Sequence, residues 1–92
     1  TYSKNLAYEV AKDLIRVNTV APGNIMFPGS TWDDKMKSNK AIVQSFIKKE
    51  VPLMRLGTAQ EVANAVLFLS SRKAAFITGA CLVVDGGQTR TF

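Results

Sequence analysis

A short β-branched segment that runs into Pro22 and Gly23 constrains this chain more than any other feature. In residues 15–21, β-branched or small side chains alternate with mostly polar ones, and this alternation predicts a strand. Pro22 cannot donate to a sheet ladder, and Gly23 permits backbone conformations closed to other residues, so we expect a turn to end the strand there. Ligands of open α/β sheets bind just beyond the carboxyl ends of strands, and this end is therefore the first place to look for a site.

The remaining periodicity predicts helices around a second strand. Apolar residues at helical spacing predict one helix before residue 15 and another over 33–50. Thr58 and Glu61 have the spacing of a capping box, which predicts that a third helix begins there. Residues 81–84 are continuously apolar, as in a buried parallel strand. Two strands joined by a long helical crossover form a parallel unit, so the predicted fold class is α/β.

Composition limits the class of protein. The 92 residues are 47% hydrophobic and 21% charged, which suits a globular domain, and no apolar run approaches the roughly 20 residues that span a bilayer. The single cysteine, Cys81, excludes an internal disulfide and favours a reducing, cytoplasmic location. The chain has no histidine, which removes the most frequent general base and zinc ligand, and no metal site is predicted.

The net charge of +5 is the one feature that could indicate a polyanionic partner. Most of the excess comes from lysines within residues 33–50, where they occupy the solvated face of an amphipathic helix. A nucleic-acid module would interleave them with exposed aromatic side chains or direct arginines at a groove. The apolar face of this helix is also short for a membrane-surface helix. We therefore predict neither a nucleic-acid nor a membrane partner.

The predicted sheet is incomplete. Strands that are apolar on both faces need helices above and below them and further strands beside them, and two strands cannot supply these. The chain also begins inside a helical pattern, without an initiator methionine. We therefore expect residues 1–92 to be a fragment of a larger domain.

Several segments together resemble the carboxyl-terminal third of a short-chain dehydrogenase/reductase. The resemblance covers nearly the whole chain, with these landmarks in order: Ile15-Arg16-Val17-Asn18, Pro22-Gly23, Arg55-Leu56-Gly57, Glu61-Val62-Ala63, Phe68-Leu69-Ser70, Ile77-Thr78-Gly79 and Val84-Asp85-Gly86-Gly87. It implies the last two strands, with connecting helices, of a Rossmann-like doubly wound parallel sheet. Residues 1–92 would then be the carboxyl-terminal part of a single NAD(P)-binding domain, with residues 26–50 as its substrate-binding insertion.

The resemblance also assigns a cofactor, NAD or NADP, of which this segment would contact only the nicotinamide end. In relatives, backbone groups just after the Pro-Gly pair bind the nicotinamide carboxamide. By that match, Ile25 supplies those hydrogen bonds, Pro22 and Gly23 shape the approach, and Asn24 lies beside them.

One further position depends on the same resemblance, and the loop around it carries an interpretation of its own. Relatives commonly have a threonine two residues after that isoleucine, where this chain has Phe27, so Ser30 or Thr31 would take over its contact or the cofactor is held without it. The loop from Met26 is unusually apolar for a connection, and Met26, Phe27 and Trp32 are candidates for the wall of a substrate pocket. The alternative is that Phe27 and Trp32 simply pack against a neighbouring helix.

No catalytic residue is assigned to this chain. The family uses a serine together with Tyr-x-x-x-Lys, in which a lysine one helical turn along lowers the pKa of the tyrosine. Tyr2 is followed by Lys4 at the wrong spacing, and Tyr8 matches Lys12 in spacing but lies too far along the sequence. The Gly-rich phosphate loop of the family is also absent from these residues.

Two functions are consistent with this sequence. The first is part of an NAD(P)-dependent oxidoreductase that interconverts an alcohol and a ketone, inactive as an isolated piece. The second is a non-catalytic interaction or oligomerisation module, because the family commonly forms dimers or tetramers through the helix at 59–71 and the strand at 81–84.

Overall fold

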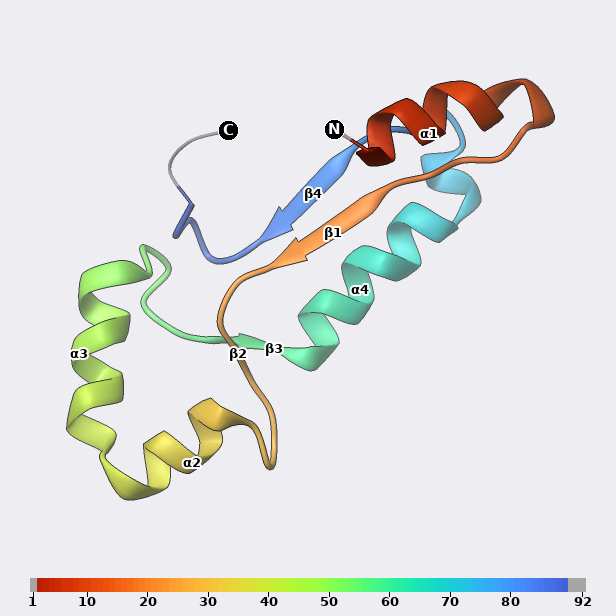
Figure 1. The fold of residues 1–92 in the computed structure, drawn as a ribbon. Helices are drawn as coiled ribbons and strands as arrows, with labels where there is room; N and C mark the ends of the chain where they lie inside the picture. The colour runs from red at the N-terminus through yellow and green to blue at the C-terminus, as the bar shows by residue number, and fades with distance from the viewer. Residues whose placement is uncertain (1, 90–92) are drawn as a thin grey trace.

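The computed structural model describes residues 2–89 and consists of helices arranged around short parallel strands (Figure 1). In chain order the elements are α1 (Tyr2–Val10), a 3-10 turn (Ala11–Asp13), β1 (Thr19–Pro22), β2 (Ile25–Met26), α2 (Thr31–Ser38), α3 (Lys40–Glu50), β3 (Gly57–Thr58), α4 (Ala59–Ser70), a second 3-10 turn (Arg72–Ala74) and β4 (Cys81–Val84). Within the described residues, none of these helices has the length and apolar character needed to cross a membrane.

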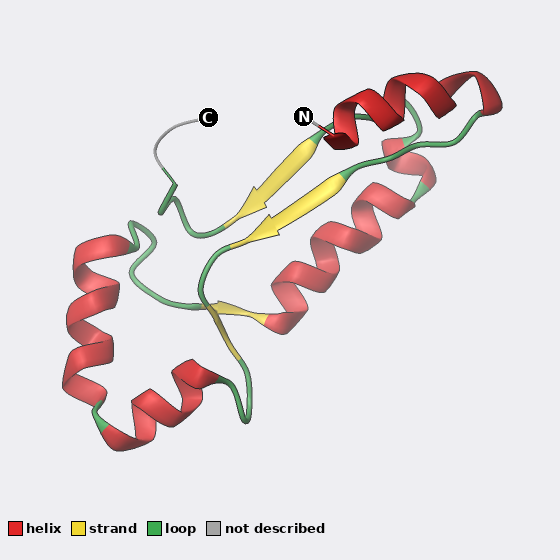
Figure 2. Ribbon diagram, viewed as in Figure 1, coloured by secondary structure: helices red, strands yellow, loops and turns green. Residues whose placement is uncertain are grey.

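The strands form two separate parallel pairs, and each pair belongs to its own lobe (Figure 2). β1 pairs with β4 in a register that runs from Thr19 opposite Cys81 to Pro22 opposite Val84. β2 pairs with β3, with Ile25 opposite Gly57. We call residues 2–22 and 59–84 the sheet lobe and residues 25–58 the insertion lobe. The parallel pairing of β1 with β4 across α4 confirms the predicted α/β unit.

The first strand is shorter than predicted and begins later, at Thr19 rather than residue 15. The residues before it use their polar groups on the end of α4 and on the loop that precedes β4 instead of on a ladder. Arg16 Nη1 donates to the carbonyls of Leu69 at 2.8 Å and Ile77 at 3.2 Å. The amide of Val17 donates to a threonine hydroxyl in the same loop at 3.1 Å. Alternation in the sequence thus identified an extended segment, of which only the second half is paired as a strand.

The predicted Pro-Gly turn is wrong in its geometry. β1 continues through Pro22, and the amide of Gly23 still donates to the carbonyl of Val84 at 2.9 Å; the chain bends only at Asn24. Pro22 fits because backbone groups alternate along a strand, so its nitrogen faces away from β4 and no ladder bond is lost.

Gly23 is required by a close approach rather than by an unusual backbone angle. It is not among the described glycines with positive φ. A Cβ atom at this position would lie 2.6 Å from the Cβ of Asp85 and 2.9 Å from its Cα, closer than real Cβ contacts. The expected conformational role of Gly23 is therefore replaced by a steric one.

Residues 33–50 form two helices rather than the single helix that was predicted. Asn39 separates them: its backbone is non-helical, and its side chain accepts from the amide of Ile42 at 3.3 Å, which caps α3. Ser30 caps α2 in the same way, accepting from the amide of Asp33 at 3.0 Å, so that helix begins at Thr31. Serine and asparagine are favoured at such positions because their side chains satisfy amides that the first turn leaves unpaired.

The insertion lobe has its own small core. Val43 is completely buried, and Val51 and Leu56 are nearly so. The rings of Trp32 and Phe46 join α2 to α3, with centroids 4.8 Å apart.

The capping box predicted at the start of α4 is confirmed. The amide of Glu61 donates to Thr58 Oγ1 at 3.1 Å, and the amide of Thr58 donates to Glu61 Oε1 at 3.0 Å. Arg55 adds a bidentate ion pair to the same carboxylate, at 2.8 and 2.6 Å. This arrangement fixes the connection between the insertion lobe and α4.

The sheet lobe buries less than the sequence suggests. We expected β4 to be fully buried, and within the described residues it is not; α4 is also only partly covered. On α4, Leu69 is buried, whereas Leu67 is 65% exposed. On β4, Cys81 and Leu82 are exposed. β4 has one neighbouring strand, so its other edge and part of α4 lie open (Figure 2).

Candidate functional site

The predicted cofactor residues lie where the two lobes meet, just beyond the carboxyl ends of β1 and β4 (Figure 1). Pro22, Gly23 and Asn24 line one cavity of about 440 Å³ together with Asp85, which directly follows β4. Ile25 does not line it and instead begins β2. The structure therefore brings three of the four residues to one cavity, and it places the fourth, Ile25, at the start of β2.

Asn24 connects three parts of the chain. Its Oδ1 accepts from the indole nitrogen of Trp32 at 3.3 Å, and its Nδ2 donates to Gln88 Oε1 at 2.8 Å. Its carbonyl accepts from the amide of Gly57 at 3.0 Å. The residue at the bend is thus held by α2, by the segment after β4 and by β3. Sequence reasoning missed Gln88, because nothing local indicates a partner 64 residues away.

The backbone of Ile25 has an open side. In a parallel ladder, neighbouring residues direct their backbone groups alternately to opposite sides of the strand. Gly57, which is opposite Ile25, bonds the carbonyl of Asn24, so the amide and carbonyl of Ile25 itself point away from β3. No other strand of the described residues pairs with β2 on that side. Ile25 therefore offers one donor and one acceptor at an unpaired edge.

Asp85 is the charged group of this region. Its carboxylate accepts from the amides of Gly87 at 2.9 Å and Thr89 at 2.8 Å. The side chain of Thr89, and after it the amides of Thr89 and Gly87, hold the pKa of Asp85 below its usual value. The sequence indicated Asp85 only as part of the landmark Val84-Asp85-Gly86-Gly87; its close approach to Gly23 appears only in three dimensions.

The two hydroxyls proposed to replace the family threonine differ in availability. Ser30 is 7% exposed, and its Oγ accepts from the amides of Phe27 and Asp33 at 3.3 and 3.0 Å. Its acceptor capacity is therefore used in the cap of α2. Thr31 is exposed, and its hydroxyl has no protein partner within residues 2–89.

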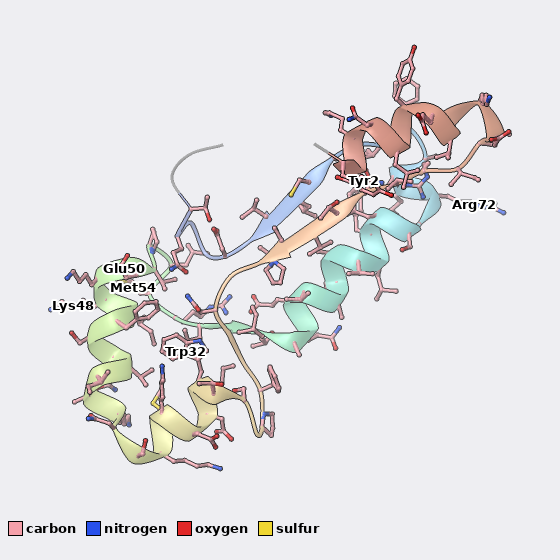
Figure 3. All side chains as sticks on the ribbon, viewed as in Figure 1. Tyr2, Trp32, Lys48, Glu50, Met54 and Arg72 are labelled. Carbon is pink, nitrogen blue, oxygen red and sulfur yellow. The ribbon has the colours of Figure 1, made fainter. Side chains whose placement is uncertain are left out.

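The three predicted substrate residues separate in space. Met26 lines a cavity of about 570 Å³ inside the insertion lobe. Phe27 is 49% exposed at the turn before α2. Trp32 packs between the ring of Phe46 and the ammonium of Lys35, 5.0 Å from the ring centroid, and points toward α3 (Figure 3). Neither Phe27 nor Trp32 lines that cavity, so Trp32 follows the packing alternative.

A third cavity, of about 240 Å³, lies between β4 and the segment that leads to α4. Asn24, Arg55 and Glu61 all line it. The Arg55 guanidinium, and after it the amide of Thr58, lower the pKa of Glu61 to about 2. This carboxylate is therefore ionised and paired at neutral pH, which suits a structural role better than proton transfer.

The remaining candidate groups lie outside the junction. Tyr2 is on α1, at the end of the molecule opposite α2 and α3 (Figure 3), and Tyr2 and Tyr8 are both more than four-fifths exposed. Residues 2–89 contain no cluster of three or more histidine, cysteine, aspartate or glutamate side chains that could hold a metal ion. Within this segment, the junction therefore offers binding groups and no acid/base pair.

Comparison with known proteins decides the family. Residues 1–89 match the family profile described as enoyl-(acyl carrier protein) reductase. The 3-oxoacyl-(acyl-carrier-protein) reductase FabG of Escherichia coli is 48% identical over 87 residues, and the short-chain dehydrogenase srdC of Neurospora crassa is 42% identical over 92 residues. The chain belongs to the short-chain dehydrogenase/reductase family. The resemblance inferred from the sequence landmarks is thereby confirmed.

Solved structures of the family support the same fold. The L-sorbose reductase of Gluconobacter frateurii, complexed with NADPH and L-sorbose, superimposes with a TM-score of 0.84 at 38% identity, covering 99% of this chain and 37% of that one. A 4-hydroxyisoleucine dehydrogenase complexed with NADH gives a TM-score of 0.83 at 36% identity, with 99% and 36% coverage. The predicted Rossmann-like fold is confirmed.

The chain spans about a third of the length of its relatives. The match covers 95% of this chain but 33% of the E. coli reductase, and 95% of this chain but 31% of the N. crassa protein. The relatives are reductases and dehydrogenases by name, and the two solved structures are complexed with NADPH and NADH.

Proposed function

We propose that this chain forms the nicotinamide-facing and substrate-facing part of an NAD(P)-dependent oxidoreductase that interconverts an alcohol and a ketone. The observation that carries the proposal is the open backbone edge of Ile25, which lies just beyond the carboxyl ends of two parallel strands. Family members of known structure bind NADPH or NADH, which supports a nicotinamide cofactor.

The groups at the junction fit a nicotinamide ring. A carboxamide has one carbonyl acceptor and one NH₂ donor, and the amide and carbonyl of Ile25 are complementary to both. Gly23 brings β1 and the segment after β4 close together, while Asn24 fixes the bend between them. When bound, the cofactor supplies the hydride chemistry, and the protein supplies orientation.

The acid/base group of the reaction is proposed to lie outside these 92 residues. The tyrosines of this chain are exposed on α1, away from the junction. The segment would therefore hold and orient the ring and the substrate while a tyrosine elsewhere in the enzyme exchanges the proton. On this proposal the isolated chain has no turnover of its own.

A graft tests the proposal directly. Residues 2–89 would replace the matching segment of the E. coli reductase, to which this chain is 48% identical, so that the rest of the domain comes from a complete enzyme. We expect the graft to bind NADPH or NADH and to reduce a 3-oxoacyl thioester or a simple ketone, and the isolated chain to show no turnover with either cofactor. A folded graft that binds neither cofactor would refute the proposal, and so would turnover by the isolated chain.

Two asparagine variants of the graft separate positioning from stability. Asn24→Ala removes the side chain that connects Trp32 and Gln88, and we expect it to raise the KM for the cofactor about tenfold, which equals the loss of about 1.4 kcal/mol. Asn39→Ala removes the cap of α3, away from the junction, and should lower stability while leaving that KM unchanged. Equal KM values for the two variants would remove Asn24 from the site.

An oligomeric contact is the second proposed role, and one observation favours it. Val66, Leu67 and Phe68 are 48%, 65% and 44% exposed on α4, and Leu82 of β4 is 37% exposed. Large apolar side chains left exposed in this way are typical of an interface between subunits. We propose that α4 and β4 contact a second copy in the complete enzyme. Light scattering of the graft should give a dimer or tetramer, and Leu67→Lys should reduce its mass; an unchanged mass would count against this surface.

A further inference from the structure

The cavity of about 570 Å³ in the insertion lobe has a distinctive lining. The chain contains three methionines, Met26, Met36 and Met54, and all three line it. Ile47 and Leu56 complete its apolar wall. A volume of roughly 300–1,000 Å³ is typical of small-molecule sites. Methionine side chains are flexible and polarisable, and they adapt to apolar ligands of irregular shape.

The position of this cavity relates it to the nicotinamide site. Met26 directly follows Ile25, whose backbone is the proposed carboxamide contact. Gly57, opposite Ile25, and Thr58, opposite Met26, also line the cavity. The cavity therefore begins at the β2–β3 pair, whose opposite edge at Ile25 would hold the ring, and is lined further by residues of α2 and α3.

Met54 has a backbone conformation that its side chain makes unfavourable. Its φ is 65°, in the left-handed region, and only one other described non-glycine residue, Leu14, shares this property. Its amide donates to the carbonyl of Val51 at 2.8 Å, which fixes the turn, and the residue is 57% exposed. Met54 lies near the carboxyl end of α3, beside Glu50 (Figure 3). Strain of this kind persists where the surroundings demand it and often marks a functional position.

The relatives leave the substrate class open, because they include reductases of 3-oxoacyl groups and of L-sorbose at similar identity. The chemistry of the cavity separates these classes. A polyol requires a hydrogen-bond partner for each hydroxyl. Four polar residues also line this cavity, but the side chains of Arg55 and Thr58 already bond Glu61, and Gln44 and Lys48 are exposed on α3, so the wall is mainly apolar. A flexible alkyl chain needs only apolar contact.

We propose that this cavity binds the alkyl chain of an aliphatic ketone or the corresponding alcohol, and that Met54 is a specificity-determining residue at its wall. The proposal rests on the proposed function for its link to hydride transfer, but not for the binding itself. It also moves the predicted substrate wall from Phe27 and Trp32 to the methionines around Met26.

Two ketones of opposite character test the proposal. The 92-residue chain would be labelled with ¹³C on its methionine methyl groups and titrated with 2-octanone or L-sorbose, without cofactor. We expect 2-octanone to shift all three methyl signals saturably and L-sorbose to shift none. If the isolated chain gives no dispersed methyl signals, the same titration would be made on the graft, with the three signals assigned by single Met→Leu variants. Shifts with L-sorbose alone, or with neither ketone, would overturn the proposal.

A substitution of Met54 separates binding from folding. Glycine adopts the left-handed conformation without strain, so Met54→Gly should raise the Tm while removing one side chain from the wall. We expect it to raise the Kd for 2-octanone about tenfold, in contrast to Leu14→Gly, which relieves the same strain at the end of the 3-10 turn after α1 and should leave the Kd unchanged. An unchanged Kd for Met54→Gly would remove Met54 from the site.

Turnover by the graft distinguishes this inference from the proposed function. A graft that reduces L-sorbose but does not bind 2-octanone would leave the oxidoreductase proposal standing and refute the alkyl site. A graft that binds 2-octanone but has no turnover with NADPH or NADH would support the cavity and refute the oxidoreductase proposal.

Discussion

The two lobes of this chain bury their apolar side chains to different degrees. In the insertion lobe, Val43, Val51 and Leu56 are at most 8% exposed, and Trp32 stacks on Phe46. In the sheet lobe, the buried hydrophobic residues are two alanines and one leucine: Ala7, Ala74 and Leu69. The insertion lobe thus has side chains large enough to form a core, whereas the sheet lobe has only the beginnings of one.

The difference shows which surfaces need further partners. The sheet lobe leaves Leu14, Leu67 and Phe76 at least 65% exposed, although its two strands are well paired. Strand pairing satisfies backbone hydrogen bonds, but the stability of a parallel sheet also requires apolar layers on both faces. The lobe with the longer strands is therefore the one that depends on additional structure, while the short-stranded insertion lobe depends on it less.

The largest expected effect concerns the isolated chain. We expect its thermal unfolding, followed by far-UV circular dichroism, to be broad and non-cooperative, because the two-stranded sheet lobe lacks the layers that make unfolding all-or-none. Amide exchange should show the strongest protection in α3 around Val43 rather than in β1 and β4. A single sharp transition with equal protection in both lobes would remove the contrast.

Gly23→Ala tests the contact that closes the carboxyl end of the sheet lobe. Because the added Cβ would lie 2.6 Å from the Cβ of Asp85, we expect the free energy of unfolding of the graft to fall by about 3 kcal/mol. Gly29→Ala is the matched control: its Cβ would meet nothing within 4 Å, and only its φ of 82° would cost about 1 kcal/mol. Equal losses in urea denaturation would mean that the approach of the two segments is not tight.

Two neighbouring residues of α3 test the core of the insertion lobe. Val43→Ala removes two methyl groups from a completely buried position and should cost about 2 kcal/mol in the graft. Ile42→Ala removes a larger side chain that is 61% exposed and should cost less than about 0.5 kcal/mol. Urea denaturation of both variants provides the comparison, and a larger loss for Ile42 would contradict the packing of this lobe.

The features that the sequence predicted correctly depend on local chemistry. The capping box of Thr58 and Glu61 needs residues only three positions apart, and it was predicted together with the helix it begins. The apolar run of β4 and the parallel α/β connection follow from hydrophobic pattern in the same way. The break at Asn39 also had a local signal, but the continuous apolar pattern across it suggested one helix.

The features that the sequence did not reveal depend on distant contacts. Gly23 is needed because Asp85 approaches it, and Asn24 is held by Gln88; neither partner is near in the sequence. The start of β1 is late because Arg16 bonds carbonyls that belong to α4 and the loop after it. The methionine-lined cavity likewise joins Met26 to residues from α2, α3 and the segment before β3. In each case a pattern of residue types gave the element, and three-dimensional packing gave the site.

The smallest expected effect concerns the ion pair that joins the lobes. The pKa of Glu61 is about 2 in the folded chain against an ordinary value of 4.5, chiefly because of its hydrogen bonds from Arg55. A carboxyl group with a lowered pKa stabilises the fold fully above its ordinary pKa, and this stabilisation is lost as the pH falls from about 4.5 toward 2. Glu61→Gln should therefore lose less stability than the unsubstituted graft across that range.

The titration of Glu61 itself shows whether Arg55 is the cause. NMR of the side-chain carboxyl carbon should give a midpoint near pH 2 in the unsubstituted graft, and Arg55→Gln should move that midpoint toward 4.5. The remaining hydrogen bond from the amide of Thr58 should keep it somewhat below the ordinary value. Because both side chains are substantially exposed, added salt should weaken the pair and raise the midpoint in the same direction. A midpoint near 4.5 before any substitution would mean that the lobes are joined by backbone contacts and not by this ion pair.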